Sequence, residues 1–257
     1  MSRDAATAGI VAARGPVRSA NHGDRDPCVV DDAVAHRAEQ PPPDDPEPAR
    51  AMGAAPPGIP RGALAWSDPG LEPSAGTSHI SVVDAEGNAV AMTSSIEYAF
   101  GSRIFVRGFL LNNQLTDFAF APESAGRLVA NRVEPGKRPR SSMAPTMVFD
   151  RAGQLQMVLG SPGGPGIINY VAKTLVATLD WGLNVQDAIA LPNFGSTNGP
   201  TLIERGTPYE ELGDTLAERG HILNFTRLTS GLHGIERIPG GWRAGADPRR
   251  EGVARGE

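Results

Sequence analysis

The sequence predicts an α+β fold for residues 71–257, and three observations lead to this class. Two pairs of short β-prone runs come first, and a turn joins the runs of each pair. Helical patterns follow, and short β-prone runs return near the end of the chain. Strands and helices segregated in this way are typical of layered α+β domains, whereas nucleotide-binding folds alternate them.

The two strand pairs carry the signature of antiparallel hairpins. In the first, "HISVVD" at residues 79–84 and "NAVAMTSS" at residues 88–95 are joined through "DAEGN", whose Asp, Gly and Asn favour a tight turn. In the second, "APTMVFD" and "QLQMVLGS" flank the turn "RAG" at residues 151–153. Each pair is therefore expected to form a hairpin.

A helical region follows the second hairpin. Within "SPGGPGIINYVAKTLVATLDWGLN" the glycine Gly182 is placed to end a helix, and apolar residues fall at helical spacing at Ile168, Val171, Leu175 and Leu179. "VQDAIAL" and "PYEELGDTLAERG" predict two further helices, the second of which stops at Gly220. "HILNFTRL" and "GGWRAG" then predict late strands.

Residues 1–70 differ in kind from the rest of the chain. Eight prolines lie between Pro41 and Pro60, among Asp, Glu, Ala and Gly that offer little apolar surface to bury. Such a stretch cannot offset the entropy of ordering, so a disordered or linker segment is expected. A short helix over "DDAVAHRAEQ" is the alternative, and it would be marginal in isolation.

Composition excludes several classes of function. A net charge of -5 and the lack of a basic run argue against a nucleic-acid partner. One cysteine, Cys28, excludes a cysteine-rich metal site, and the five histidines lack the close spacing of zinc ligands. The sequence offers neither a membrane-spanning apolar stretch nor a signal peptide at its start.

Thr77 stands in "GTSH", directly after Gly76 and directly before a strand. Threonine favours strands and turns, so an ordinary role at the start of a strand is one interpretation. The other is chemical: an N-terminal threonine combines a hydroxyl nucleophile with its own α-amine as base, whose pKa of about 7.7–8.0 suits neutral pH. Cleavage of the bond between Gly76 and Thr77 would expose that amine.

From about Leu71 to its end the chain resembles the small, catalytic subunit of the gamma-glutamyltranspeptidases, or glutathione hydrolases, which are N-terminal-nucleophile hydrolases. Four blocks carry the resemblance in the family's order, namely "GTSHISVVDAEGNAVAMTSSIEYAFGS", "GFLLNNQLTDF", "PGKRPRSSMAPT" and "GSPGG". The resemblance implies half of an αββα sandwich, self-cleavage at Gly76 and Thr77, and gamma-glutamyl transfer or hydrolysis without a metal or cofactor.

The resemblance also implies roles for single residues. Thr77 would be the nucleophile, and Ser95 would support it. Glu97, Gln114 and Asp117 would bind the α-ammonium of the substrate, since carboxylates match its charge. Further implied roles are the α-carboxylate donors Ser141 and Ser142 and the oxyanion-binding backbone N–H groups of Gly163 and Gly164. His79 would be structural, because the family uses the amine as base.

Two features depart from the family pattern. After "GSPGG" relatives commonly continue with Ser-Arg, whereas this chain has Pro165 and Gly166. The segment before Thr77 also matches nothing in the family's large subunit, apart from its last few residues. That subunit completes the sandwich and supplies an arginine for the α-carboxylate, and no residue of this chain is assigned to that arginine.

The expected function is therefore gamma-glutamyl transfer or hydrolysis on glutathione-like compounds, with a large-subunit segment as heterodimer partner. The alternatives are an amidohydrolase of the cephalosporin-acylase type and a truncated, non-catalytic remnant. Relatives are typically periplasmic or secreted, and the lack of a signal peptide in this sequence leaves a cytoplasmic location open.

Overall fold

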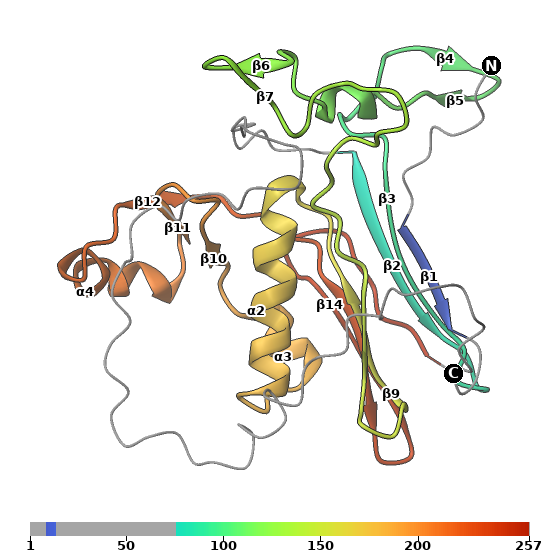
Figure 1. Ribbon diagram of the computed structural model, residues 1–257. Helices are drawn as coiled ribbons and strands as arrows, with labels where there is room; N and C mark the ends of the chain where they lie inside the picture. Colours follow the sequence, from blue (N-terminus) through green and yellow to red (C-terminus); the bar gives the residue numbers. More distant parts are fainter. Residues whose placement is uncertain (1–8, 14–75, 257) are drawn as a thin grey trace.

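Two β-sheets lie face to face in the computed structural model, which describes residues 9–13 and 76–256 (Figure 1). The first sheet is three-stranded and antiparallel, in the order β1-β3-β2. Its strands are β1 (Gly9–Ala13), β2 (Thr77–Val83) and β3 (Ala89–Ser95). The second sheet is four-stranded, in the order β14-β13-β9-β8. Its strands are β8 (Thr146–Phe149), β9 (Leu155–Gly160), β13 (His233–Ile238) and β14 (Gly241–Ala246).

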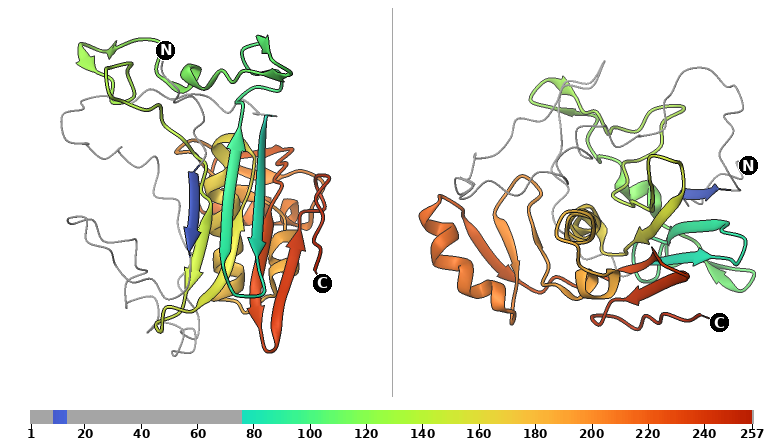
Figure 2. Two further views of the ribbon diagram at one scale, coloured as in Figure 1. Left: turned by 90° about the vertical axis from the view of Figure 1, so that its right-hand side faces the viewer. Right: turned by 90° about the horizontal axis from the view of Figure 1, so that it is seen from below.

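Helices α2 (Ile167–Leu179) and α3 (Val185–Ala190) cover the outer face of the four-stranded sheet, as the view from below in Figure 2 shows. Apolar side chains from both helices and from the sheet form the main core, comprising Met157, Leu159, Ile167, Tyr170, Val171, Val185, Ile189 and Leu232. The other face of this sheet packs on β2 and β3. The described residues thus form three successive layers, helix, sheet and sheet.

The outer face of the three-stranded sheet carries no helix within residues 9–13 and 76–256. Two apolar side chains of β2 point to that side, and Ile80 and Val82 are each 48% exposed. Burying such a face stabilises a sandwich, because apolar area removed from water contributes about 25 cal/mol per Å². The fourth layer expected of an αββα sandwich is therefore the one that these residues lack.

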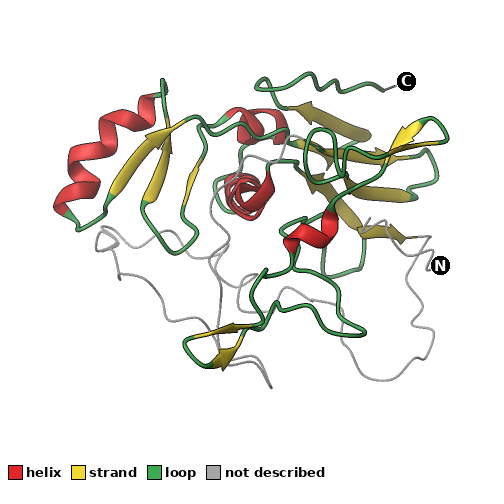
Figure 3. Ribbon diagram, turned by 90° about the horizontal axis from the view of Figure 1, so that it is seen from above, coloured by secondary structure: helices red, strands yellow, loops and turns green. Residues whose placement is uncertain are grey.

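Two smaller parts extend from the sandwich (Figure 3). One contains β10 (Phe194–Gly195), β11 (Thr201–Glu204), β12 (Leu223–Thr226), the 3₁₀ turn η4 (Pro208–Leu212) and α4 (Gly213–Glu218). The other, residues 97–139, we call the cap, because it lies across one end of the sheets. It contains β4 (Phe105–Val106), β5 (Phe109–Leu110), the 3₁₀ turn η2 (Gln114–Asp117), β6 (Glu123–Ser124) and β7 (Arg127–Leu128).

The expected α+β class, both hairpins, the three helical segments and both late strands are confirmed. The first hairpin is longer than expected, because β2 begins at Thr77. Of the apolar residues at helical spacing in α2, Val171 is buried, whereas Ile168 and Leu179 are 56% and 48% exposed. Gly182, with φ of +71°, follows α2 at the turn, as predicted.

Strand β13 was not predicted, although it joins β9 to β14 in the middle of the larger sheet. Strand β1 was not predicted either, and it lies within the stretch 1–70 that was expected to be a linker. The remainder of that stretch, with the alternative helix at residues 31–40, lies outside the described residues. Within those residues, no helix is both long and apolar enough to cross a bilayer.

A buried histidine links the two sheets. His79 of β2 is almost fully buried, and its Nδ1 atom lies 2.8 Å from Thr93 Oγ1 while its Nε2 atom lies 3.1 Å from Ser81 Oγ. Ser81 in turn donates to the carbonyl of His233 on β13. Burial, with a smaller contribution from the charge of His233, lowers the pKa of His79 from 6.5 to about 4.

The stability of the protein is therefore expected to fall as the pH drops from about 6.5 to about 4. In this range His79 is protonated in the unfolded chain but stays neutral in the folded chain, so protonation favours the unfolded chain. At 1.36 kcal/mol per pKa unit, the loss is about 3 kcal/mol. Urea unfolding at pH 7 and pH 4.5 measures it. His79→Gln should flatten this dependence, whereas His221→Gln, on the part that contains α4, should leave it unchanged.

Candidate active site

A cavity of about 400 Å³ lies between the cap and the ends of the two sheets. Its walls come from the start of β2, the end of β3, the cap, residues 140–143 and the loop before α2. Most of the residues selected from the sequence line it, namely Thr77, Ser95, Glu97, Gln114, Asp117, Ser141, Ser142 and Gly164. Gly76 and Gly163 do not line the cavity but directly precede residues that do.

Thr77 and Ser95 face each other across the first hairpin. Thr77 is the first residue of β2, and it pairs with Ser95, the last residue of β3. Their hydroxyl oxygens lie 2.8 Å apart, and the N–H of Glu97 donates to Ser95 Oγ over 2.9 Å. Thr77 is buried, so its hydroxyl is held in one place by a single neighbour. Such a pair can pass a proton between two oxygens.

Backbone hydrogen bonds on both sides of Gly76 fix the peptide bond between Gly76 and Thr77. The carbonyl of Gly76 accepts a hydrogen bond from the N–H of Ile96 over 3.0 Å, and the N–H of Gly76 donates to the carbonyl of Glu97 over 3.2 Å. A Cβ atom at Gly76 would lie 2.6 Å from the carbonyl oxygen of Tyr98. Only glycine fits so close to a backbone, which explains the residue at this junction.

Three side chains on the cap side form an acidic cluster. The side-chain nitrogen of Gln114 donates to Glu97 Oε2 over 2.9 Å and to Asp117 Oδ2 over 2.5 Å. Burial raises the pKa of Glu97, and the negative charge of Asp117 raises it further. Glu97 adopts a φ of +71°, which is uncommon for a residue with a side chain. A cation placed between the two carboxylates would relieve their repulsion.

Another part of the lining carries two neighbouring hydroxyl groups. Ser141 and Ser142 line the cavity on the segment that leads into β8, and Ser141 Oγ accepts a hydrogen bond from the N–H of Met143 over 3.2 Å. That bond leaves the hydroxyl proton of Ser141 available for an acceptor in the cavity.

The glycine loop before α2 lines the same cavity as Thr77, through Gly164 and Pro165. Gly163 and Gly164 have φ values of +133° and +56°, which L-residues with side chains rarely adopt. A Cβ atom at Gly163 would lie 2.6 Å from the ring of Tyr170, and one at Gly166 would lie 2.8 Å from the same ring. Gly166, which departs from the family pattern together with Pro165, therefore leaves room for the ring of Tyr170.

Asn131 was missed by the sequence reasoning, although it lines the cavity. Its side-chain nitrogen donates to the carbonyl of Asp117 over 2.6 Å, and its side-chain oxygen accepts from the N–H of Arg140 over 3.0 Å. Asn131 thus ties the acidic side of the cavity to the serine side. A lone asparagine in a loop carries no local signal of such a role.

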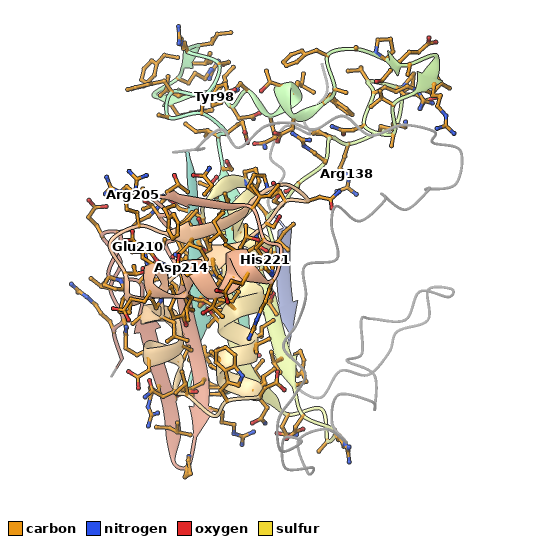
Figure 4. The ribbon with its side chains drawn as sticks, turned by 90° about the vertical axis from the view of Figure 1, so that its left-hand side faces the viewer. Tyr98, Arg138, Arg205, Glu210, Asp214 and His221 are labelled. Carbon is orange, nitrogen blue, oxygen red and sulfur yellow. The ribbon has the colours of Figure 1, made fainter. Side chains whose placement is uncertain are left out.

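The histidines lie away from this cavity. His79 does not line it, and both of its ring nitrogens have partners in the sheet. Figure 4 shows His221 near α4, separate from the cavity-lining Tyr98 on the cap. His233 does not line the cavity either, so none of the three described histidines is placed to serve Thr77 as a base.

Comparison with known proteins places this geometry in a family. The family model described as gamma-glutamyltranspeptidase matches residues 43–257. The chain belongs to the gamma-glutamyltranspeptidase family. A relative from Pseudomonas aeruginosa named glutathione hydrolase proenzyme is 35% identical over 197 residues, which make up 72% of this chain and 35% of the relative. The chain thus spans about a third of that relative's length.

Solved structures agree with the family. A mutant of the gamma-glutamyltranspeptidase from Helicobacter pylori matches with a TM-score of 0.61 and 33% identity, over 67% of this chain and 99% of the matched chain. The cephalosporin acylase from Bacillus halodurans matches with a TM-score of 0.61 and 26% identity, over 70% of this chain and 34% of that one. The predicted N-terminal-nucleophile hydrolase fold of the gamma-glutamyltranspeptidase family is therefore confirmed.

Proposed function

We propose that the chain is the catalytic region of a gamma-glutamyl-transferring or gamma-glutamyl-hydrolysing enzyme whose nucleophile is Thr77. The observation that carries this proposal is the position of the Thr77 hydroxyl. It is buried against Ser95 at one end of a cavity whose other walls offer carboxylates and hydroxyl groups. Membership of the family and the name proenzyme borne by the Pseudomonas aeruginosa relative support the same function.

The first step would be cleavage of the chain at Thr77. The Thr77 hydroxyl attacks the carbonyl carbon of Gly76, which the N–H of Ile96 polarises. The C–N bond then breaks, its nitrogen takes up the hydroxyl proton, and an ester forms between Gly76 and the Thr77 oxygen. Water hydrolyses that ester, which leaves a carboxylate on Gly76 and a free amine and hydroxyl on Thr77.

Turnover would repeat this chemistry on a substrate. The free amine of Thr77 takes the hydroxyl proton as the oxygen attacks the γ-carbonyl carbon, and it returns that proton to the departing amine. The backbone N–H groups of Gly163 and Gly164 would stabilise the oxyanion. Water, or the amine of an amino acid or peptide, then breaks the ester and releases the γ-glutamyl group.

The charges around the cavity suit the amino-acid end of a γ-glutamyl group. Glu97 and Asp117 would face its ammonium, while Ser141 and Ser142 would donate to its carboxylate. An ammonium between Glu97 and Asp117 would also remove the repulsion that raises the pKa of Glu97. The proposed mechanism uses neither a metal nor an organic cofactor.

Substrate binding should weaken as the pH falls through the raised pKa of Glu97, because the ammonium needs the ionised carboxylate. The KM for γ-glutamyl-p-nitroanilide is expected to rise over that range while kcat changes less. Asp117→Asn removes the negative charge beside Glu97, so it should shift this rise in KM to lower pH. An identical pH dependence of KM in the variant and the wild type would contradict the proposed pairing.

The match to a cephalosporin acylase favours a second candidate, in which the nucleophile is the same but the acyl group differs. Glutaryl-p-nitroanilide lacks the α-ammonium of the γ-glutamyl compound, so the two compounds separate the candidates. The acidic cluster of Glu97 and Asp117 would bind the α-ammonium that the glutaryl compound lacks, so it predicts a preference for γ-glutamyl. A preference for glutaryl would favour the acylase.

A partner is part of this proposal. The outer face of β2 exposes Ile80 and Val82, and the chain spans only about a third of the Pseudomonas aeruginosa relative. We propose that a large-subunit segment covers this face as a heterodimer partner. A periplasmic or secreted location would follow from the same family resemblance.

A further inference from the structure

The cavity has one cationic side chain in its described lining, and the sequence reasoning did not select it. Three acidic residues line the cavity, Glu97, Asp117 and Glu123, whereas Arg140 is the single Lys, Arg or His among the described lining residues. Since exposed charges are screened, a lone guanidinium acts mainly on groups in direct contact with it. Its neighbours therefore indicate what it could bind.

Arg140 directly precedes the serine wall. Arg140, Ser141 and Ser142 are consecutive and all three line the cavity. Asn131 Oδ1 accepts from the backbone N–H of Arg140 over 3.0 Å, which fixes the start of this segment against the cap. The side chain of Arg140 is exposed and forms no ion pair within 4.0 Å among the described residues.

The guanidinium of Arg140 lies near enough to the acidic cluster to affect the pKa of Glu97. Its positive charge opposes, as the smallest of several contributions, the burial and the Asp117 charge that raise the pKa of Glu97. The cavity is therefore polarised, with carboxylates on the side of the cap and hydroxyl groups beside a cation on the segment that leads into β8. A zwitterion of amino-acid type has the complementary arrangement of charges.

We propose that Arg140 binds the α-carboxylate of the γ-glutamyl group together with Ser141 and Ser142, and so makes the site selective for substrates that carry this carboxylate. This inference rests on the proposed function. A guanidinium presents several N–H donors in one plane and pairs with both oxygens of a carboxylate. Arg140 thus supplies, from within this chain, the cation that the family resemblance assigns to a partner segment.

The test removes the positive charge of Arg140 from the protein and, separately, the α-carboxylate from the substrate. Arg140→Gln is assayed in the full chain with γ-glutamyl-p-nitroanilide and with 4-aminobutanoyl-p-nitroanilide, which differs only by the missing α-carboxylate. Losing a charge-assisted pair at a partly exposed site is expected to lower kcat/KM about tenfold for the first substrate. The second substrate should lose little, because it has no carboxylate to bind. Arg140→Lys should recover part of the loss.

Arg138→Gln is the matched control. Arg138, labelled in Figure 4, lies two residues earlier in the sequence, and it is exposed but does not line the cavity. Its replacement should leave the ratio of kcat/KM between the two substrates unchanged. Equal losses for both substrates in Arg140→Gln, or no loss for either, would overturn the assignment of Arg140.

Binding distinguishes a failure of this inference from a failure of the proposed function. Calorimetric titration of the full chain with L-glutamate and with 4-aminobutanoate needs no turnover. If the wild type hydrolyses neither p-nitroanilide, even with a large-subunit segment present, the proposed function is contradicted. A tenfold weaker affinity of Arg140→Gln for L-glutamate alone would still support the pairing. An unchanged affinity for L-glutamate, or no binding of it by the wild type, would overturn it.

Discussion

Thr77→Ala is expected to leave the chain uncut and to abolish hydrolysis of γ-glutamyl-p-nitroanilide. Alanine lacks the only group that Thr77 places against Ser95 in the cavity, so the bond to Gly76 meets no attacking oxygen. Removing a nucleophile that acts in both steps leaves nothing to replace it, and activity should fall to background. Denaturing electrophoresis and a release assay for p-nitroaniline measure the two effects.

Two variants serve as controls for this loss. Thr77→Ser keeps the hydroxyl and should retain both cleavage and turnover at reduced rates. Ser78→Ala removes the next hydroxyl along β2, which is exposed and does not line the cavity, so it should behave as the wild type. Turnover that persists in Thr77→Ala would remove Thr77 from the role of nucleophile.

Gly163→Ala is expected to reduce kcat by a factor of about 10²–10³, the usual cost of losing one oxyanion-binding donor. The added Cβ would lie 2.6 Å from the ring of Tyr170, and the φ of +133° is unfavourable for alanine. The loop must therefore shift, and its N–H groups would no longer point to the oxyanion. KM should change less than kcat, because these N–H groups act mainly in the transition state.

The control for this loop is Gly153→Ala in the turn between β8 and β9. Gly153 also has a positive φ, of +75°, but apart from its own atoms and its two chain neighbours nothing lies within 4 Å of the position of its Cβ. Both variants should lose some stability through strain, as thermal unfolding would show, while only Gly163→Ala loses turnover. Equal kcat values for the two variants would contradict an oxyanion-binding role for the loop at Gly163.

The hairpins could be predicted from the sequence because a turn and its two flanking strands are adjacent in the chain. The turn "DAEGN" and the alternation in the flanking runs define β2 and β3 without reference to the rest of the chain. Strand β13 escaped prediction, since its sequence, HGIERI, is short, mixed and lacks a clear alternation. Helical spacing predicted α2 but does not say which side of the helix meets the sheet, and Ile168 lies on the exposed side.

Most of the candidate site came from motifs, yet its assembly depends on long-range packing. Thr77, Asp117 and Ser142 are far apart in sequence, and only the folded cap and the two sheets bring them to one cavity. Asn131 and Arg140 were missed because their roles arise from where the loop of the cap lies. No local sequence pattern identifies a residue such as Asn131, which hydrogen-bonds to two separate segments of the cavity lining.

Mass spectrometry of the intact purified chain tests the central claim most directly, since everything proposed for turnover requires a free amine on Thr77. We expect two fragments, of which one begins at Thr77 and the other ends at Gly76, and we expect Thr77→Ala to give a single full-length mass. A wild-type chain that stays at its full-length mass, even after incubation with a large-subunit segment, would contradict this account and favour a non-catalytic remnant.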